Sequence, residues 1–272
     1  MTRSLVRLFA ASALALCLAL CLAPAAFAQD DDDAVLKPAE PDFILVNLPT
    51  ALRLPVYKSS FRVTHRFNGP LKGSGIEDLF GLDEGAQIGL EYRFGIIKNG
   101  QIGFLRLSNK TIDLFANYGV LRQGKSSPVE VSAALSIEGT NNFKDSYSPS
   151  VGAVISRRIG DVVALYVEPT WVNNTNDLPK EVVDHNDTVY VGVGARVRIR
   201  PTVYVVAEVV PRTSGYKPGT NQASFAIEKR AGGHMFQLNV SNGAAAIPAS
   251  LATGAFSKDN WYLGFNLARK FY

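Results

Sequence analysis

Cysteine and histidine are both scarce in this chain, and their scarcity excludes several kinds of site. The two cysteines, Cys17 and Cys21, both lie in an apolar N-terminal stretch. If that stretch is removed on export, no disulfide, thiolate nucleophile or cysteine-ligated metal site is available. Histidine is limited to His65, His185 and His234, so few imidazoles could serve as a catalytic base or a metal ligand.

Long apolar runs are lacking after residue 28. A transmembrane helix needs roughly 18 or more consecutive apolar residues, and no such run follows. Before that point, Arg3 and Arg7 precede an apolar core at 8–23 and a small-x-small site at 26–28, which is the pattern of a cleaved secretory signal. We therefore expect residues 1–28 to be a signal peptide, and any membrane insertion of the mature chain to use strands.

A strong excess of charge of one sign is lacking as well. The net charge is +4, and loss of Arg3 and Arg7 with the signal lowers it to about +2. The composition therefore predicts no nucleic-acid partner. The acidic run at 30–33 and the prolines after it are typical of a solvated linker. Residues 29–59 are accordingly interpreted as a periplasmic leader, the segment through which a periplasmic partner would bind.

From residue 60 onward the hydrophobic period is two. The clearest segment is 188–199, in which apolar residues alternate with polar or small ones. Similar segments recur to the end of the chain and give about twelve strands of roughly ten residues each. The weak segment is 101–107, where Ile102 with Phe104 competes with Leu105 and Leu107 for the apolar face.

The connections between these strands alternate in length. Tight ones at 97–100, 159–161 and 200–201 alternate with long ones such as 68–85 and 242–259. Short turns on one rim, long loops on the other and an aromatic-rich final strand favour an outer-membrane barrel over a secreted β-sandwich, whose apolar face would point inward. We predict an all-β fold: a single antiparallel transmembrane β-barrel over residues 60–272, surrounded by outer-membrane lipid, with both termini periplasmic.

Three segments carry a family resemblance. They are Thr64-His65-Arg66-Phe67, Asp78-Leu79-Phe80-Gly81-Leu82-Asp83-Glu84-Gly85-Ala86 and Leu263-Gly264-Phe265-Asn266-Leu267-Ala268-Arg269-Lys270-Phe271. With these segments the chain resembles a domain-of-unknown-function family of bacterial outer-membrane β-barrel proteins. The resemblance implies an outer-membrane barrel of a Gram-negative bacterium and supplies no activity, ligand or catalytic residue.

Charged side chains in the polar phase of the strands are predicted to line the lumen, because charges at membrane depth persist only when they are paired or wet. The lumen-lining candidates are Arg62, Arg66, Glu91, Arg93, Asp113, Glu130, Glu168, Arg196, Arg198, Glu208 and Glu228. Two interpretations stay open. Arg–Glu pairs would form a structural polar core, whereas water between these groups would make a narrow channel of mixed charge, which Arg196 and Arg198 would bias toward anions.

The loop around 76–86 offers Asp78, Asp83 and Glu84 for a constriction folded into the lumen, although its glycines equally suit a plain turn. No nucleophile–base motif is present. The sequence predicts no catalytic residue, no metal site and no cofactor. The functions it favours are, in order, a narrow passive channel for small polar or ionic solutes, a non-conducting barrel that serves as an anchor or envelope partner, and an outer-membrane enzyme.

Overall fold

The computed structural model describes residues 38–272, apart from 73–74, 76–77, 79–80, 177–185 and 256. The predicted signal peptide at 1–28, the acidic run at 30–33 and His185 therefore lie outside the described residues. Within the described part of the chain, no helix is long and apolar enough to cross a membrane.

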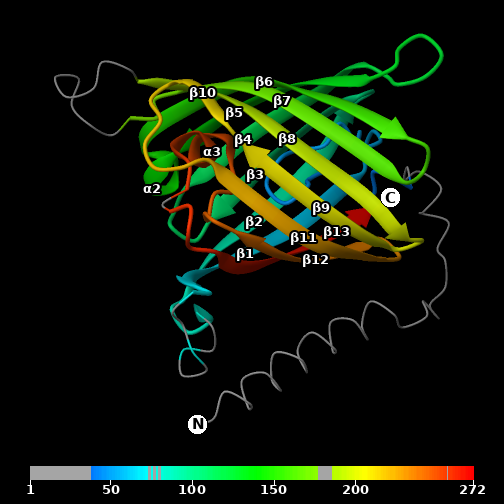
Figure 1. Ribbon diagram of the computed structural model, residues 1–272. Helices are drawn as coiled ribbons and strands as arrows, with labels where there is room; N and C mark the ends of the chain where they lie inside the picture. Colours follow the sequence, from blue (N-terminus) through cyan, green and yellow to red (C-terminus); the bar gives the residue numbers. More distant parts are fainter. Residues whose placement is uncertain (1–37, 73–74, 76–77, 79–80, 177–185, 256) are drawn as a thin grey trace, which may run out of the picture.

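Antiparallel strands make up most of the described chain (Figure 1). They are β1 (Ser59–Pro70), β2 (Ala86–Ile97), β3 (Gly100–Leu107), β4 (Ile112–Leu121), β5 (Glu130–Gly139), β6 (Asp145–Ile159), β7 (Val163–Asn173), β8 (Asp187–Arg200), β9 (Val203–Val210), β10 (Arg212–Gly215), β11 (Gln222–Ala231), β12 (His234–Ser241) and β13 (Tyr262–Phe271). Consecutive strands pair from β1 to β9, β9 then pairs with β11, and β11, β12 and β13 pair in turn until β13 pairs with β1; the short β10 pairs with β8 only. The predicted closed antiparallel barrel of 12 strands is confirmed, with β10 extending the path of β9 beyond Pro211.

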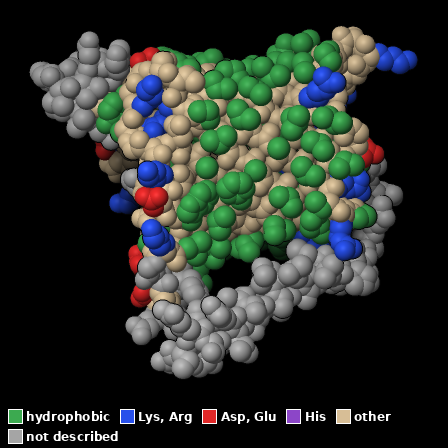
Figure 2. Space-filling view, viewed as in Figure 1, with side chains coloured by type: hydrophobic (Ala, Val, Ile, Leu, Met, Phe, Trp, Pro, Cys, Tyr) green, Lys and Arg blue, Asp and Glu red, His purple; other side chains and the backbone are tan. Residues whose placement is uncertain are grey.

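The alternation along each strand separates a lipid face from a lumenal face, as successive side chains of a strand must. On β2, Leu90 is 46% exposed whereas the next residue, Glu91, is 5% exposed. Figure 2 shows hydrophobic side chains spread over the middle of the barrel wall, with Lys and Arg side chains toward the two rims. This distribution is that of a barrel surrounded by hydrocarbon.

The ambiguous strand β3 has Ile102 and Phe104 on the outer face and Leu105 and Leu107 on the lumenal face. The two leucines are buried against Ala246 and Ile247, which belong to the connection between β12 and β13. Period alone could not assign this strand because both of its faces are apolar, one toward lipid and one toward chain inside the barrel.

The two rims differ in the length of their connections. The short-turn rim carries turns at 98–99, 160–162, 201–202 and 232–233, and the long-loop rim carries connections at 71–85, 174–186 and 242–261. The connection from β5 to β6 contains a short left-handed turn, labelled α2 (Thr140–Phe143), and the connection from β12 to β13 contains α3 (Pro248–Thr253). The alternation of turn and loop lengths that the sequence predicts is therefore present.

The final strand closes the barrel in the expected place. β13 pairs with β1 in a register that sets Thr64 opposite Asn266 on the lumenal side and His65 opposite Phe265 on the outer side. The rings of His65 and Phe265 stack with centroids 4.7 Å apart. This aromatic contact joins the first and last strands on the lipid face.

Candidate functional site: a lumen closed from both ends

The lumen-lining candidates lie where their phase predicts, with one partial exception. Arg62, Arg66, Glu91, Arg93, Asp113, Glu130, Glu168, Arg196, Glu208 and Glu228 are all buried inside the barrel. Arg198 is half-buried next to the short-turn rim, where its Nε donates to the carbonyl of Pro201 (3.1 Å).

Several of these charges are paired inside the lumen, within one strand or between strands. Arg196 Nε donates to Glu228 Oε2 (2.8 Å), and Arg93 Nη2 donates to Glu91 Oε1 (3.1 Å). Arg62 also donates to Glu91, through Nε at 3.1 Å. Arg196 is therefore neutralised by its partner, and the structure does not provide the pair of free guanidiniums at 196 and 198 that an anion-selective path would require.

The centre of the lumen is occupied by the chain that precedes β1, residues 38–56, which we call the lumenal segment (drawn in blue in Figure 1). Every residue from 39 to 48 is buried. The segment forms a hairpin, in which Thr50 N donates to Phe43 O and Leu45 N donates to Leu48 O, each at 2.8 Å. The expectation of a solvated linker is thus wrong for this part of the chain, because its apolar run at 44–46 is packed inside the barrel.

Glu208 on β9 holds the tip of this hairpin. Its Oε2 accepts hydrogen bonds from the backbone N–H groups of Val46, Asn47 and Leu48 at 3.0, 3.0 and 3.2 Å. Its Oε1 accepts a bond from Asn47 Nδ2 at 2.6 Å. Successive N–H groups converging on one carboxylate are a backbone anion site, and here the anion belongs to the barrel wall.

The carbonyl groups of the lumenal segment are bound by cations and amides of the wall. The donors are Arg66 to Val46 O (3.2 Å), Asn266 to Val46 O (3.1 Å), Gln237 to Leu45 O (2.6 Å) and Arg196 to Ile44 O (2.7 Å). Buried backbone polar groups require such partners. The polar lumen wall that the sequence predicts therefore serves mainly to hydrogen bond a second piece of the same chain.

The part of the lumenal segment closer to the short-turn rim is held by ion pairs. Asp42 lies 3.0 Å from Lys270 Nζ on β13, and Glu40 accepts a bond from the Tyr166 hydroxyl at 3.0 Å. Burial alone would raise the pKa of Asp42, but the positive charges of Lys270 and Arg196 outweigh it and hold that pKa below its usual 3.8. Asp42 is thus a carboxylate at neutral pH.

Close packing adds to these polar bonds. Glycines on β8 leave room for two leucines of the lumenal segment: a Cβ at Gly192 would lie 2.8 Å from Leu48 Cδ2, and one at Gly194 would overlap Leu45. Leu45 and Leu48 belong to one buried apolar cluster with wall residues and with the connection between β12 and β13. The lumen therefore contains an apolar core in addition to its polar network.

The long-loop rim is covered by that connection, residues 242–261 apart from 256, which we call the capping loop. Ala245, Ile247 and Leu251 of this loop are 7%, 3% and 1% exposed. Arg212 on β10 fixes the end of α3, with Nη1 donating to Thr253 O at 2.8 Å and also to Pro218 O. The sequence predicts a long loop at 242–259 on this rim; the structure has it there and folds part of it inward against the wall.

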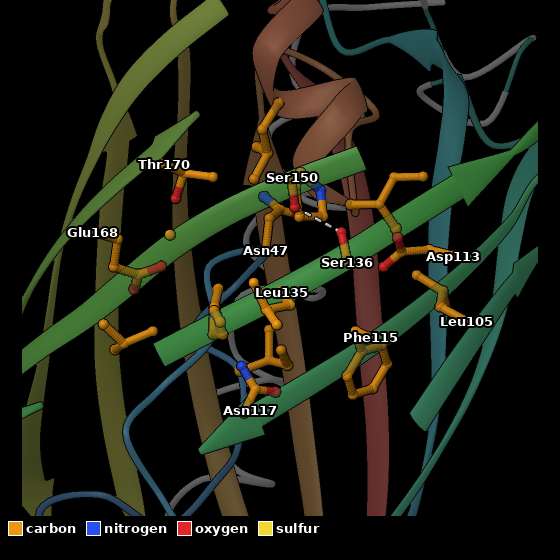
Figure 3. Close-up of a pocket in the computed structure, with 18 of the residues that line it drawn as sticks. Asn47, Leu105, Asp113, Phe115, Asn117, Leu135, Ser136, Ser150, Glu168 and Thr170 are labelled. Atoms are coloured by element: carbon orange, nitrogen blue, oxygen red, sulfur yellow. Dashed lines mark hydrogen bonds between the residues drawn. The ribbon is translucent and has the colours of Figure 1, made fainter. Parts of the chain in front are cut away.

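A cavity of about 70 Å³ lies between the lumenal segment and the capping loop. Figure 3 shows Glu168 and Asp113 on different sides of it, with Ser136, Ser150 and Thr170 between them. Asn47 reaches it from the lumenal segment and Ile247 from the capping loop. Because a water molecule needs about 10 to 15 Å³ of such volume, this cavity has room for several water-sized groups.

The predicted loop constriction is not found at this cavity. Asp78, Asp83 and Glu84 are exposed on the long-loop rim. His65 lies on the outer face, and His234 meets Arg269 at the short-turn rim, so neither imidazole reaches the lumen. Among the described residues, no group of three or more His, Cys, Asp or Glu side chains is arranged to hold a metal ion.

The sequence interpretation missed that the lumenal segment is bound inside the barrel, and therefore the role of the polar-phase residues Gln237 and Lys270 in binding it. One signal was present: apolar residues occupy the lumenal phase of several strands, as Val154, Tyr166 and Val206 do on β6, β7 and β9. Such side chains are unfavourable against water and indicate that apolar chain must cover them. The apolar run at 44–46 was the segment available to do so.

The protein family and solved structures to which this chain is similar match it over nearly the whole barrel. A family model described as Membrane bound beta barrel domain (DUF5777) matches residues 42–271. No curated protein sequence matches the chain. Among solved structures, the NanC porin is 6% identical, with 79% of this chain and 99% of that chain covered and a TM-score of 0.50, which shows a shared fold. An outer membrane channel from Pseudomonas putida F1 is 11% identical, with 80% and 97% covered and a TM-score of 0.49.

Proposed function

Because the chain belongs to the membrane-bound β-barrel family whose model matches residues 42–271, we propose that it is an outer-membrane channel for small polar or ionic solutes that is closed by its own chain. In the described conformation the lumenal segment closes the short-turn rim and the capping loop closes the long-loop rim. Export by removal of residues 1–28 belongs to the same proposal, and N-terminal sequencing of the membrane-inserted protein tests it, with Gln29 as the expected first residue.

The observation that carries the proposal is how the lumenal segment is bound. Its backbone is held by side chains of the wall, such as Glu208 and Arg66, rather than by strand pairing with the barrel. The barrel itself is closed by β1 and β13 without the segment. Displacing the segment therefore breaks side-chain contacts and leaves the ladder of the barrel intact, which is the property that a removable stopper needs.

Two variants test the proposal in planar bilayers. Deletion of residues 38–54 should give a folded barrel whose conductance clearly exceeds that of the full chain. Replacement of Leu48 and Gly192 by cysteine, L48C with G192C, should lock the segment when oxidised, because these positions are in contact and the described chain contains no other cysteine. Reduction of this disulfide should restore the conductance of the full chain.

A second candidate function, a non-conducting structural barrel, is favoured by the paired charges of the lumen, such as Arg196 with Glu228. In that function the segment is part of a permanent core. The deletion separates the two: a variant without residues 38–54 that inserts, migrates as a folded barrel and does not conduct would support the structural barrel and reject the channel.

A further inference from the structure

We infer that the cavity between the lumenal segment and the capping loop is a binding site for a small zwitterion, a solute that carries an ammonium group and a carboxylate a few bonds apart. The inference deepens the proposed function and rests on it for the route by which a solute reaches the lumen. It arises from buried polar atoms for which the described residues offer no hydrogen-bond partner.

Three such atoms belong to residues that line this one cavity. They are Arg62 Nη1, Asp113 Oδ1 and Glu168 Oε1, none of which has a hydrogen-bond partner among the described residues. Their residues are 4%, 4% and 2% exposed. Buried polar atoms are nearly always hydrogen bonded, so one unmatched donor and two unmatched acceptors around a single cavity indicate a ligand that both accepts and donates.

The ionisable side chains around the cavity are of both kinds, guanidinium on one side and carboxyl on the other. Arg62 and Arg93 share one carboxylate, that of Glu91, which leaves an excess positive charge on this side. Glu168 has no cationic partner in the described part of the chain, and its charged neighbour is another carboxylate, Glu208. Burying a charge without compensation is costly, and a ligand with both signs of charge would compensate both sides at once.

The strand order places the guanidinium of Arg62 and the carboxyl of Glu168 on opposite sides of the lumen. Arg62 lies on β1 and Glu168 on β7, and the strand order places five strands between them in either direction around the barrel. They therefore project from opposite walls. Asp113, on β4, projects from midway between them, and Figure 3 shows its carboxylate and that of Glu168 directed toward the space they enclose.

The volume of the cavity and its apolar lining limit the ligand to a small solute with a short carbon chain. The volume of about 70 Å³ accommodates a solute of roughly six non-hydrogen atoms, taking about 10 to 15 Å³ for each water-sized group. Leu105, Phe115 and Ile247 supply an apolar lining for a short carbon chain. A simple cation would leave the Arg62 donor unmatched, and a simple anion would leave both carboxyl oxygens unmatched.

The experiment measures binding to the full chain in detergent by calorimetry, with β-alanine as the zwitterion and propionate and propylammonium as analogues that each lack one charge. Each charge-assisted hydrogen bond supplies enough free energy for about a tenfold or larger change in affinity. We therefore expect β-alanine to bind at least about tenfold more tightly than either analogue. Equal binding of the three probes, tight binding of propylammonium alone, or no binding of β-alanine would overturn the inference.

A substitution assigns the ammonium end. Glu168→Gln keeps the shape of the side chain and removes its charge, so it should weaken β-alanine binding about tenfold or more and leave propionate binding unchanged. Glu84→Gln, the same change at an exposed carboxylate on the long-loop rim, should alter neither. If β-alanine binds equally well to the Glu168→Gln protein, the proposed site is wrong.

Conductance distinguishes this failure from a failure of the channel. If the protein lacking residues 38–54 conducts while the full chain binds none of the probes, the channel stands and the zwitterion site falls. If β-alanine binds the full chain as expected and the deletion variant does not conduct, the site stands and the channel falls.

Discussion

Substitution of Glu208 by glutamine probes the contact that holds the tip of the lumenal segment. In the parent protein the carboxylate accepts bonds from three backbone N–H groups and from Asn47 Nδ2. Glutamine keeps the length of the side chain but presents one acceptor oxygen and an NH₂ group. The NH₂ group faces donors, so part of this set must go unmatched.

The size of the effect follows from the kind of bond that is lost. A hydrogen bond to a charged group contributes roughly 1.5 to 3 kcal/mol, and leaving a buried donor unmatched costs a similar amount. If two of the four bonds are lost, docking of the segment weakens by about 3 to 6 kcal/mol. Since each 1.4 kcal/mol is about a factor of ten, the ratio of undocked to docked segment should rise by roughly 10² to 10⁴.

Two assays report that ratio. Open probability in planar bilayers should rise in the Glu208→Gln protein, and so should the rate at which protease cleaves within residues 39–54. The barrel itself should still migrate faster on a gel unboiled than boiled, because its strand ladder is untouched. Glu84→Gln is the control, since it makes the same change at an exposed carboxylate on the long-loop rim.

One result would refute the reasoning about Glu208. If the Glu208→Gln protein has the open probability and the protease resistance of the parent, the carboxylate does not hold the segment in place. An increase in cleavage without an increase in conductance would mean that the segment moves but that another part of the chain closes the lumen, with the capping loop as the nearest structure able to do so.

Three further predictions concern other contacts. Phe265→Arg should destabilise the barrel by roughly 2 to 4 kcal/mol, since Phe265 faces lipid on the closing strand. Phe265→Leu, which keeps an apolar side chain, should have only a mild effect on the urea midpoint of unfolding. An unchanged midpoint in the Phe265→Arg protein would contradict the prediction. Because the pKa of Asp42 is lowered below its usual 3.8, its pairing with Lys270 stabilises docking above about pH 4 and is lost as the pH falls below that value. Protease cleavage of the lumenal segment should therefore increase below about pH 4 in the parent protein. If the same pH dependence of cleavage persists in the Asp42→Asn protein, another group is responsible for it. Gly194→Ala should also increase cleavage, because its methyl group overlaps Leu45, whereas Gly124→Ala, where a Cβ meets nothing within 4 Å, should not.

The barrel was predictable because its determinants are local. The alternation within each strand indicates which side chains face lipid, as with Val193, Ala195 and Val197 on the outer face and Arg196 on the inner face. The lengths of the connections indicate which strand ends lie on the same rim. Strand order then follows from chain order, and closure follows from the absence of open edges in lipid. Little of this depends on which residues meet across the interior.

The contents of the lumen were not predictable in the same way, because phase gives the direction of a side chain and not its partner. Glu208 and Arg66 point inward as the sequence predicts, but they contact Asn47, which is 161 and 19 residues away. Asp113 and Glu168 follow the same inward pattern and have no cationic partner in the described part of the chain. Residues with the same inward phase therefore have three different roles: some pair with other residues of the wall, some bind the lumenal segment, and some lie unmatched at the cavity.

The course of the chain indicates which of the two stoppers opens. The lumenal segment enters and leaves by the short-turn rim: Pro38 O is bonded by Tyr204, near the turn at 201–202, and the backbone of Tyr57 and Lys58 is bonded to Gly95, near the turn at 98–99. A hairpin with both ends at one rim can withdraw through that rim without threading past any strand. The capping loop is instead joined to β12 and β13 at its two ends and is fixed by Arg212, so it can only swing about those attachments. Opening by withdrawal therefore starts with the lumenal segment, and tension on the chain before residue 38 would break the contacts of Glu40 with Arg158 (3.4 Å) and of Asp42 with Lys270 before it reached the bonds at Glu208.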